Sequence, residues 1–182
     1  LRFRANAVSS ADIIMKEGTQ LSFATSGTGF SLNAKVKLEG DVELKMSGSA
    51  DGNFMEILGS FHGNNQITAF NNTNAENVES KVILSGNNSN FSGTWDATKE
   101  SRVASSYVVY EGKSEQAFGN GNIVIGTGNK VIFSHEKSLG AANELLLQLG
   151  AKAVLSKSVT VGKLILGETE YTSGTFSAST HA

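Results

Sequence analysis

The feature that most constrains this chain is a short aliphatic motif that returns many times over residues 82–176. Each copy has an aliphatic residue, any residue and a second aliphatic residue, and Gly or Asn recurs between the copies. A short strand that recurs without helices between its copies is typical of a β-solenoid, in which stacked coils bury one continuous core. The copies are Val82-Ile-Leu84, Ile123-Val-Ile125, Val131-Ile-Phe133, Leu145-Leu-Leu147, Val159-Thr-Val161 and Leu164-Ile-Leu166.

Proline is absent from the 182 residues, whereas glycine occurs 20 times. Average usage would give about nine prolines in a chain of this length. Because proline has no backbone N–H, it is excluded from strands that are paired on both sides. The composition therefore favours a chain in which nearly every segment lies between two hydrogen-bonded neighbours, as in a solenoid.

The spacing of the motif predicts the size of one coil. Ile123 and Leu145 are 22 residues apart, Leu145 and Leu164 are 19 apart, and a second strand falls inside each interval. A period near 20 with two or three short strands predicts a right-handed parallel β-helix. It would have about eight or nine coils and a length of about 40 Å at about 4.8 Å per coil. A β-sandwich, which also has many short strands with frequent turns, is the alternative.

We expect a single elongated domain over residues 1–182, with the clearest repeats in 82–178. Residues 1–80 follow the period less clearly, so a less regular N-terminal β part joined to a C-terminal solenoid is a further alternative. Residues 30–38 alternate strictly between apolar and polar, which predicts one long half-buried strand. Residues 138–149 have helical propensity, but Gly140 and Gly150 bracket them, and we predict a strand there.

Charge, cysteine content and hydropathy exclude several classes of function. The chain has 15 basic and 17 acidic residues without a basic run, which argues against a nucleic-acid partner. It contains no Cys, so disulfides and thiolate metal sites are excluded. No apolar stretch reaches the roughly 18 residues that a membrane span needs, so we expect no membrane insertion.

Three motifs in residues 86–178 resemble the repeats of bacterial autotransporter-type passenger domains. In those domains one motif opens a coil, a second marks a turn into the next strand and a third closes the array. The corresponding segments here are Asn90-Phe-Ser-Gly-Thr-Trp95, Phe118-Gly-Asn-Gly-Asn-Ile-Val-Ile125 and Tyr171-Thr-Ser-Gly-Thr-Phe176. The resemblance covers about half of the chain.

The resemblance implies a right-handed parallel β-helix that is exposed on a bacterial cell surface as a stalk, adhesin or coat. The family supplies no fixed catalytic residues that could be assigned to positions in this sequence. We therefore expect an extracellular or cell-surface location and no enzymatic activity.

An enzymatic β-helix would need carboxylates that converge on one wall of the rod. None of the acidic residues forms a recognisable motif, and charges on the wet face of a strand usually serve solvation. The candidates are Asp41 with Glu43, Asp51 with Glu56, and Asp96 with Lys99, Glu100 and Arg102.

Metal and cofactor sites are not expected. His62, His135 and His181 are far apart, and no second ligand stands at the required spacing. Asp51-Gly-Asn53 is interpreted as a turn, because the rest of a calcium loop is missing. The glycine-rich residues 119–121 and 126–128 lack the lysine and following helix of a phosphate loop.

Three aromatic residues have two possible roles. Trp95, Tyr107 and Tyr110 could stack on sugar rings at the surface, or they could fill the core of the rod. The asparagines of the three sequons, Asn71, Asn87 and Asn90, are expected to form hydrogen-bonded ladders at coil corners rather than glycosylation sites.

The pattern as a whole predicts a structural or adhesive surface protein. The alternative is a carbohydrate-binding or polysaccharide-degrading β-helix. No capping pattern stands at either end, so we expect end-to-end self-association or continuation into a longer chain, with surface glycans or host proteins as further partners. Leu1, Phe3 and Val8 form a candidate assembly segment.

Overall fold

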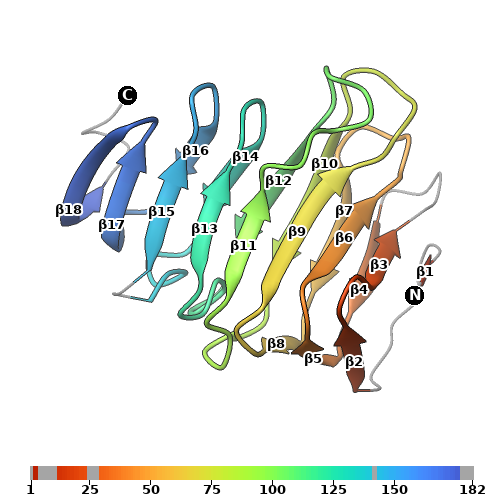
Figure 1. Ribbon diagram of the computed structural model, residues 1–182, viewed down its shortest axis with the longest axis horizontal. Coiled ribbons are helices and arrows are strands. Elements are labelled where there is room, and N and C mark those ends of the chain that lie inside the picture. Colours follow the sequence, from red (N-terminus) through yellow and green to blue (C-terminus); the bar gives the residue numbers. More distant parts are fainter. Residues whose placement is uncertain (1, 4–11, 24–28, 141–142, 177–182) are drawn as a thin grey trace.

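The fold is a right-handed β-solenoid of about five turns, in which the described residues form strands and turns but no helix (Figure 1). The computed structural model describes residues 2–3, 12–23, 29–140 and 143–176. The predictions for Leu1, Val8 and His181 lie outside the described residues. The prediction of an all-β parallel β-helix is confirmed, and the β-sandwich alternative is wrong.

Three sheets form the sides of the solenoid, and they contain nine, six and three strands. The nine-stranded sheet, called the long sheet below, is made of β1 (Arg2–Phe3), β3 (Gln20–Phe23), β6 (Val42–Met46), β9 (Gln66–Asn71), β11 (Thr94–Ala97), β13 (Asn122–Ile125), β15 (Glu144–Leu147), β17 (Val159–Leu166) and β18 (Thr169–Phe176). The six-stranded sheet is made of β4 (Gly29–Leu32), β7 (Asn53–Ile57), β10 (Glu79–Leu84), β12 (Tyr107–Gly112), β14 (Lys130–Phe133) and β16 (Lys152–Leu155). The three-stranded sheet is made of β2 (Ile13–Lys16), β5 (Lys35–Glu39) and β8 (Ser60–His62).

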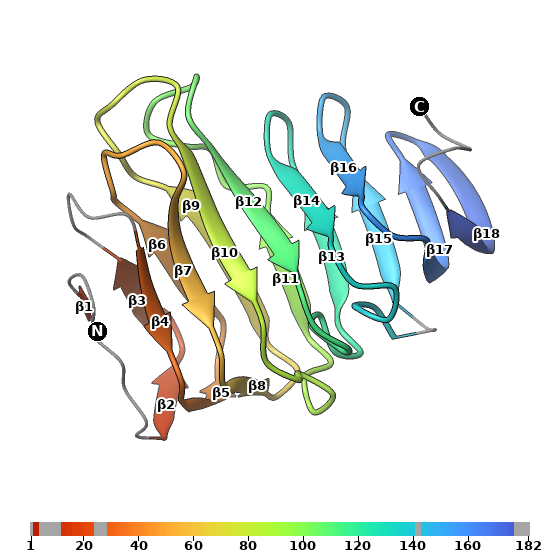
Figure 2. The same ribbon diagram turned by 180° about the vertical axis from the view of Figure 1, so that it is seen from behind.

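The strands of successive turns pair in parallel, and each turn lies one strand further along the rod (Figure 2). The first turns contribute a strand to each of the three sheets, whereas later turns contribute strands only to the long and six-stranded sheets. A single bridge between Gly63 and Phe91 continues the third side beyond β8. The cross-section therefore changes from three strands per turn to two.

The core is a set of rows in which inward side chains of successive turns stack on one another. One row follows the register of the long sheet, and all its members are at most 6% exposed. Its members are Val42, Ile67, Trp95, Ile123, Leu145 and Leu164. Three of the six, Ile123, Leu145 and Leu164, are positions of the sequence motif, so in the C-terminal half the motif encodes the core directly.

The prediction of eight or nine coils is wrong. Register partners are 28 residues apart from Ile67 to Trp95 and again from Trp95 to Ile123, compared with 22 from Ile123 to Leu145. Two long loops, residues 72–78 after β9 and 98–106 after β11, lengthen these turns and stand out together at one side of the rod (Figure 1). Longer turns, together with terminal segments that are not complete turns, reduce the number of coils.

The described part of residues 1–80 belongs to the same solenoid, because β6 pairs with both β3 and β9 within the long sheet. The prediction of one long strand over residues 30–38 is wrong, since β4 and β5 lie in different sheets. Ala34 occupies the corner between them with its side chain inward and 2% exposed. Alternation continues across the corner, which is why the sequence pattern did not reveal the break.

The expected strand within the helix-prone residues 138–149 is present as β15. The segment that resembles a closing motif lies in β18, which pairs antiparallel with β17 and so ends the parallel order of the long sheet. The described part of the chain contains no helix that is long and apolar enough to cross a membrane.

Glycines form a stacked corner where the backbones of neighbouring turns touch. A Cβ added to Gly59 would lie 1.9 Å from the carbonyl oxygen of Ala34, and one added to Gly86 would lie 1.6 Å from that of Gly59. Neither glycine has a positive φ. Any side chain at these two positions would therefore collide with the preceding turn rather than strain its own backbone.

We expect Gly86→Ala to lower the free energy of unfolding by about 3 kcal/mol or more, because the clash involves backbone that cannot move aside. Gly128→Ala is the matched control: its φ is +79° and its Cβ would meet nothing within 4 Å. The control should lose only about 1–2 kcal/mol, the cost of a left-handed backbone. Denaturant unfolding of both variants tests this order, and an equal loss would contradict it.

Buried asparagines join successive turns at the corners, but of the sequon asparagines only Asn71 is among them, since Asn87 and Asn90 are exposed. Asn88 is fully buried; its Oδ1 accepts a hydrogen bond from the backbone N–H of Phe61 (2.7 Å), and its Nδ2 donates to the carbonyl of Ala117. Asn129 forms the same kind of bridge between Val108 and Ala97. Each such side chain thus pairs with a backbone N–H and a backbone carbonyl of the turns beside it, so these polar groups have a partner in the protein.

We expect Asn88→Ala to destabilise the protein by about 2 kcal/mol, because it leaves the buried N–H of Phe61 without a partner. Asn90→Ala, at an exposed position two residues away, is the control and should change stability by less than about 0.5 kcal/mol. Thermal or denaturant unfolding measures both. Equal stability of the two variants would show that the corner bridge contributes nothing.

A basic cleft on the long sheet

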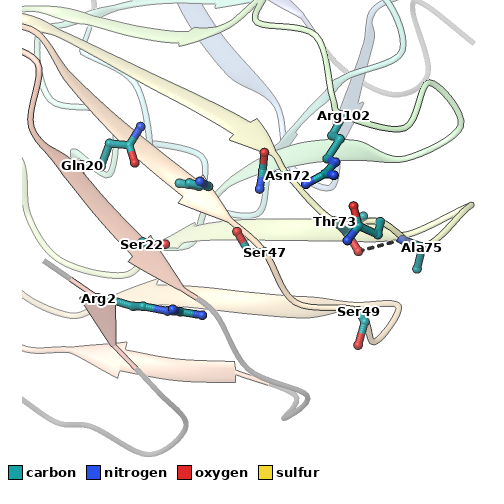
Figure 3. A pocket seen from close by; sticks show the side chains of 11 residues that line it. Arg2, Gln20, Ser22, Ser47, Ser49, Asn72, Thr73, Ala75 and Arg102 are labelled. Carbon is teal, nitrogen blue, oxygen red and sulfur yellow. Dashed lines mark hydrogen bonds between the residues drawn. The ribbon is translucent and has the colours of Figure 1, made fainter.

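A cleft of about 800 Å³ lies on the outer face of the long sheet. Its floor is formed by β1, β3 and β6, and its wall by the residues that follow β9 and β11. Figure 3 shows Arg2 and Arg102 at its two ends, with Ser22, Ser47 and Asn72 between them. We call it the basic cleft; it is lined by Arg2, Gln20, Ser22, Lys45, Ser47, Ser49, Asn72, Thr73, Asn74, Ala75 and Arg102.

The cations of the cleft come from three distant parts of the sequence. Arg2, Ser22 and Lys45 are register partners on adjacent strands β1, β3 and β6. Because neighbouring strands are about 4.8 Å apart, the backbones of Arg2 and Lys45 are about 10 Å apart. Arg102 is held at the other side by a hydrogen bond from its backbone N–H to the carbonyl of Asn71 (2.9 Å).

The three cations have no carboxylate partner in the cleft. None of its lining residues, among those the structure describes, is Asp or Glu. The ion pairs between described residues do not involve Arg2, Lys45 or Arg102. The remaining lining is almost entirely hydroxyl and amide groups, with Ala75 as the one apolar side chain of this described set.

The carboxylate beside the cleft, that of Glu43, is already bound. It accepts hydrogen bonds from Lys99 and from Gln20, and Lys99 also lies 3.8 Å from the centre of the Phe70 ring. Burial raises the pKa of the Glu43 carboxyl, but the bonds from Lys99 and Gln20, together with the charges of Lys99 and Lys45, outweigh burial and hold the pKa below its ordinary value. Glu43 is thus ionised at neutral pH and is directed toward Lys99.

Hydrogen bonds between the two long loops hold the wall of the cleft in place. The backbone N–H of Asn77 donates to Oγ of Ser105 (3.1 Å), and that of Val78 donates to Oγ of Ser106 (3.0 Å). Ser106 Oγ in turn donates to the carbonyl of Ala75 (2.8 Å). Within the first loop, Thr73 Oγ1 accepts the N–H of Ala75, the bond drawn in Figure 3. The wall is therefore an ordered part of the fold.

A second recess of about 460 Å³ lies on the other side of loop 98–106 and is lined by Glu100 and Tyr107 among others. The Tyr107 hydroxyl donates to Glu79 (2.8 Å), and Lys130 contacts the same carboxylate (3.1 Å). The bond to Glu79 is the main cause that raises the pKa of Tyr107 to about 12. Tyr107 is therefore a neutral, half-buried group whose ring lies beside Lys130.

The structure separates the three aromatic candidates for sugar stacking. Trp95 and Tyr110 are 0% exposed, so stacking on a sugar is wrong for both and the core alternative holds. Trp95 contacts the rings of Phe61, Phe91, Tyr110 and Phe118, and its Nε1 donates to the carbonyl of Phe118 (2.9 Å). Of the three, Tyr107 alone lines one of the two recesses.

Two of the candidate acids share a wall: Glu43 and Asp96 are both register partners of Thr68 on the long sheet, two strands and about 10 Å apart, but each is bound by other groups. Asp41, Asp51 and Asp96 each accept a backbone N–H at a corner or turn, and Glu56 accepts the hydroxyls of Ser31 and Ser85. Glu100 lines the second recess, whereas Arg102 of the same predicted group lines the basic cleft. These acids have separate structural tasks.

Within the described residues no group of three metal-ligating side chains exists. His62 Nε2 pairs with Ser60 Oγ (2.9 Å), and burial together with Lys35 lowers the pKa of its imidazole. His135 Nδ1 accepts the backbone N–H of Lys137 at a turn. Phe3 of the candidate assembly segment lies in β1, where its backbone is paired with that of Phe23 in the same chain.

Sequence reasoning missed Arg2 and Lys45, because each is a single cation between two apolar residues of a strand and belongs to no motif. Arg102 was considered only as a partner for nearby acids. The signal that could have found Lys45 is its outward position in the alternating segment 42–46, two residues from Glu43. Arg2, Lys45 and Arg102 line the same cleft because of the strand register and the lengths of the turns, which a single sequence does not specify.

Comparison of the chain with family models, with curated proteins and with solved structures gave no match. The structure supports the resemblance to autotransporter-type passenger domains as far as the fold is concerned, because the chain forms a stacked β-solenoid.

The only tryptophan, Trp95, should report burial in the core. We expect blue-shifted fluorescence that is protected from acrylamide, and both properties should be lost on unfolding. Trp95→Ala should cost about 3–5 kcal/mol of stability. Quenching as strong as that of free tryptophan in the folded protein would contradict this position.

Proposed function

We propose that the protein is a non-catalytic structural or adhesive β-helical rod exposed on a bacterial surface. The observation that supports this proposal is the parallel ladder. Strands in the middle of the rod, such as β9 and β10, are hydrogen-bonded on both sides to strands of neighbouring turns. A backbone paired in this way offers few sites for local unfolding, and local unfolding is what proteases require.

Two further features support a binding rather than a catalytic role. The basic cleft contains no carboxylate among its described lining, so it offers no general acid or base of that type. The motifs that resemble passenger repeats begin and end turns of the solenoid: Trp95 opens a turn in β11, and the closing segment forms β18. A surface location follows from that resemblance and remains part of the proposal.

Surface exposure is tested on intact cells that produce the protein. An antibody raised against the purified rod should stain intact cells, and external proteinase K should remove the epitope while a cytoplasmic marker stays intact. Staining that appears only after permeabilisation would overturn the surface assignment. The purified protein should resist the same protease, and cleavage within minutes at many sites would contradict a structural role.

End-to-end association of copies is part of the same proposal, with β16 as the contact. The inward-facing Ala153 of this strand is exposed, although its register partner Val131 in β14 is 0% exposed, and Val154 is 42% exposed. Among the described strands, β16 is paired only with β14, so its other edge is free. A free edge with exposed apolar side chains favours pairing with a second copy.

Sedimentation across a range of concentrations tests the association. We expect oligomers whose size increases with concentration, and Val154→Glu should shift the distribution to monomer because a charge at a sheet edge opposes pairing. Leu58→Glu, at a 44% exposed apolar position between β7 and β8, is the control and should leave association unchanged. A monodisperse monomer for the unmodified protein would overturn this part of the proposal.

A further inference from the structure

We propose that the basic cleft binds an acidic polysaccharide, with Lys45 and Arg102 contacting its carboxylate or sulfate groups. This inference rests on the proposed adhesive function, for which it supplies the ligand class.

The first step is electrostatic. Arg2, Lys45 and Arg102 line one cleft without a carboxylate among its described lining, although the whole chain carries two more acidic than basic residues. Cations elsewhere are paired, as Lys99 is with Glu43 and Lys163 with Glu170 (2.9 Å). Arg2, Lys45 and Arg102 form no ion pair among the described residues, and the one carboxylate whose charge Lys45 reaches, that of Glu43, is already bound by Lys99. The excess of positive charge attracts an anion from solution.

The second step concerns shape and direction. Arg2, Ser22 and Lys45 form a row that runs across the strands, along the axis of the rod. The two long loops border this row on one side, and Arg102 comes from the second loop. An extended polymer lying along the rod therefore meets Arg2 and Lys45 about 10 Å apart, with Arg102 on the bordering loop.

The third step identifies the ligand as a saccharide. Ser22, Ser47, Ser49, Asn72 and Thr73 give the cleft hydroxyl and amide groups that both donate and accept hydrogen bonds, as sugar hydroxyls do. Single-stranded nucleic acid is recognised by aromatic stacking, and no aromatic residue is among the described lining. A lipid would need an apolar surface, for which Ala75 is too small.

The test is a titration of the purified protein with oligosaccharides of matched length at about 0.05 and 0.3 M salt. The probes are a sulfated glucosamine-uronate chain, an unsulfated polyuronate, neutral dextran and single-stranded DNA. We expect binding to at least one acidic glycan that weakens with salt through screening, and no binding to dextran. Comparison of the sulfated and unsulfated arms identifies the acidic group.

The double variant Lys45→Ala/Arg102→Ala should weaken this binding about tenfold, because it removes two charge-assisted contacts of roughly 0.7 kcal/mol each. Lys137→Ala is the control, since Lys137 is exposed, far from the cleft residues in sequence and 3.8 Å from Glu115; it should change affinity less than twofold. Circular dichroism and thermal unfolding verify that all variants remain folded.

Three outcomes would overturn the inference: no binding to either acidic glycan, unchanged binding by the double variant, or tighter binding to DNA than to the glycans. None of these outcomes changes the protease test on cells, so the proposed ligand of the cleft can be wrong while the proposed surface location is correct. Conversely, salt-dependent glycan binding by a protein that never reaches the surface would contradict the proposed function alone.

Discussion

The structure depends on one constraint, which is that every turn must bring its inward side chains into register with those of the turns before and after it. Parallel pairing places identical strand positions on top of one another, so an error of one residue in any turn would exchange the inward and outward faces. Buried rows such as the one through Ile67, Trp95 and Ile123 make that exchange costly. Corner glycines and asparagines hold the register between the strands.

This constraint explains which parts of the molecule could be predicted from sequence. Inward positions alternate with outward ones inside each short strand, so the aliphatic triplets identified the core and the fold class. Turn length has no such requirement, because residues 72–78 and 98–106 extend outward without moving β9, β11 or their neighbours. The predicted number of coils was therefore too large, although the strands themselves were correctly recognised.

The basic cleft could not be predicted for the same reason. Lys45 and Arg102 are 57 residues apart, and two turns of variable length lie between them. Trp95 illustrates the opposite case, because an aromatic residue within an alternating strand has two possible faces, and only the register decides between core and surface. Residues whose role depends on one strand were predicted well, whereas residues whose role depends on several turns were not.

The loops that carry the cleft wall are joined to each other through Ser105 and Ser106. The second loop also contacts the rod, because Lys99 binds Glu43 of β6 and the backbone N–H of Arg102 donates to Asn71 of β9. A replacement loop pair that keeps these two contacts can be exchanged as one unit while the stacked core remains unchanged. The solenoid thus separates the part of the sequence that determines stability from the part that determines what the surface recognises. Replacing this pair of loops would therefore change which ligand the surface recognises.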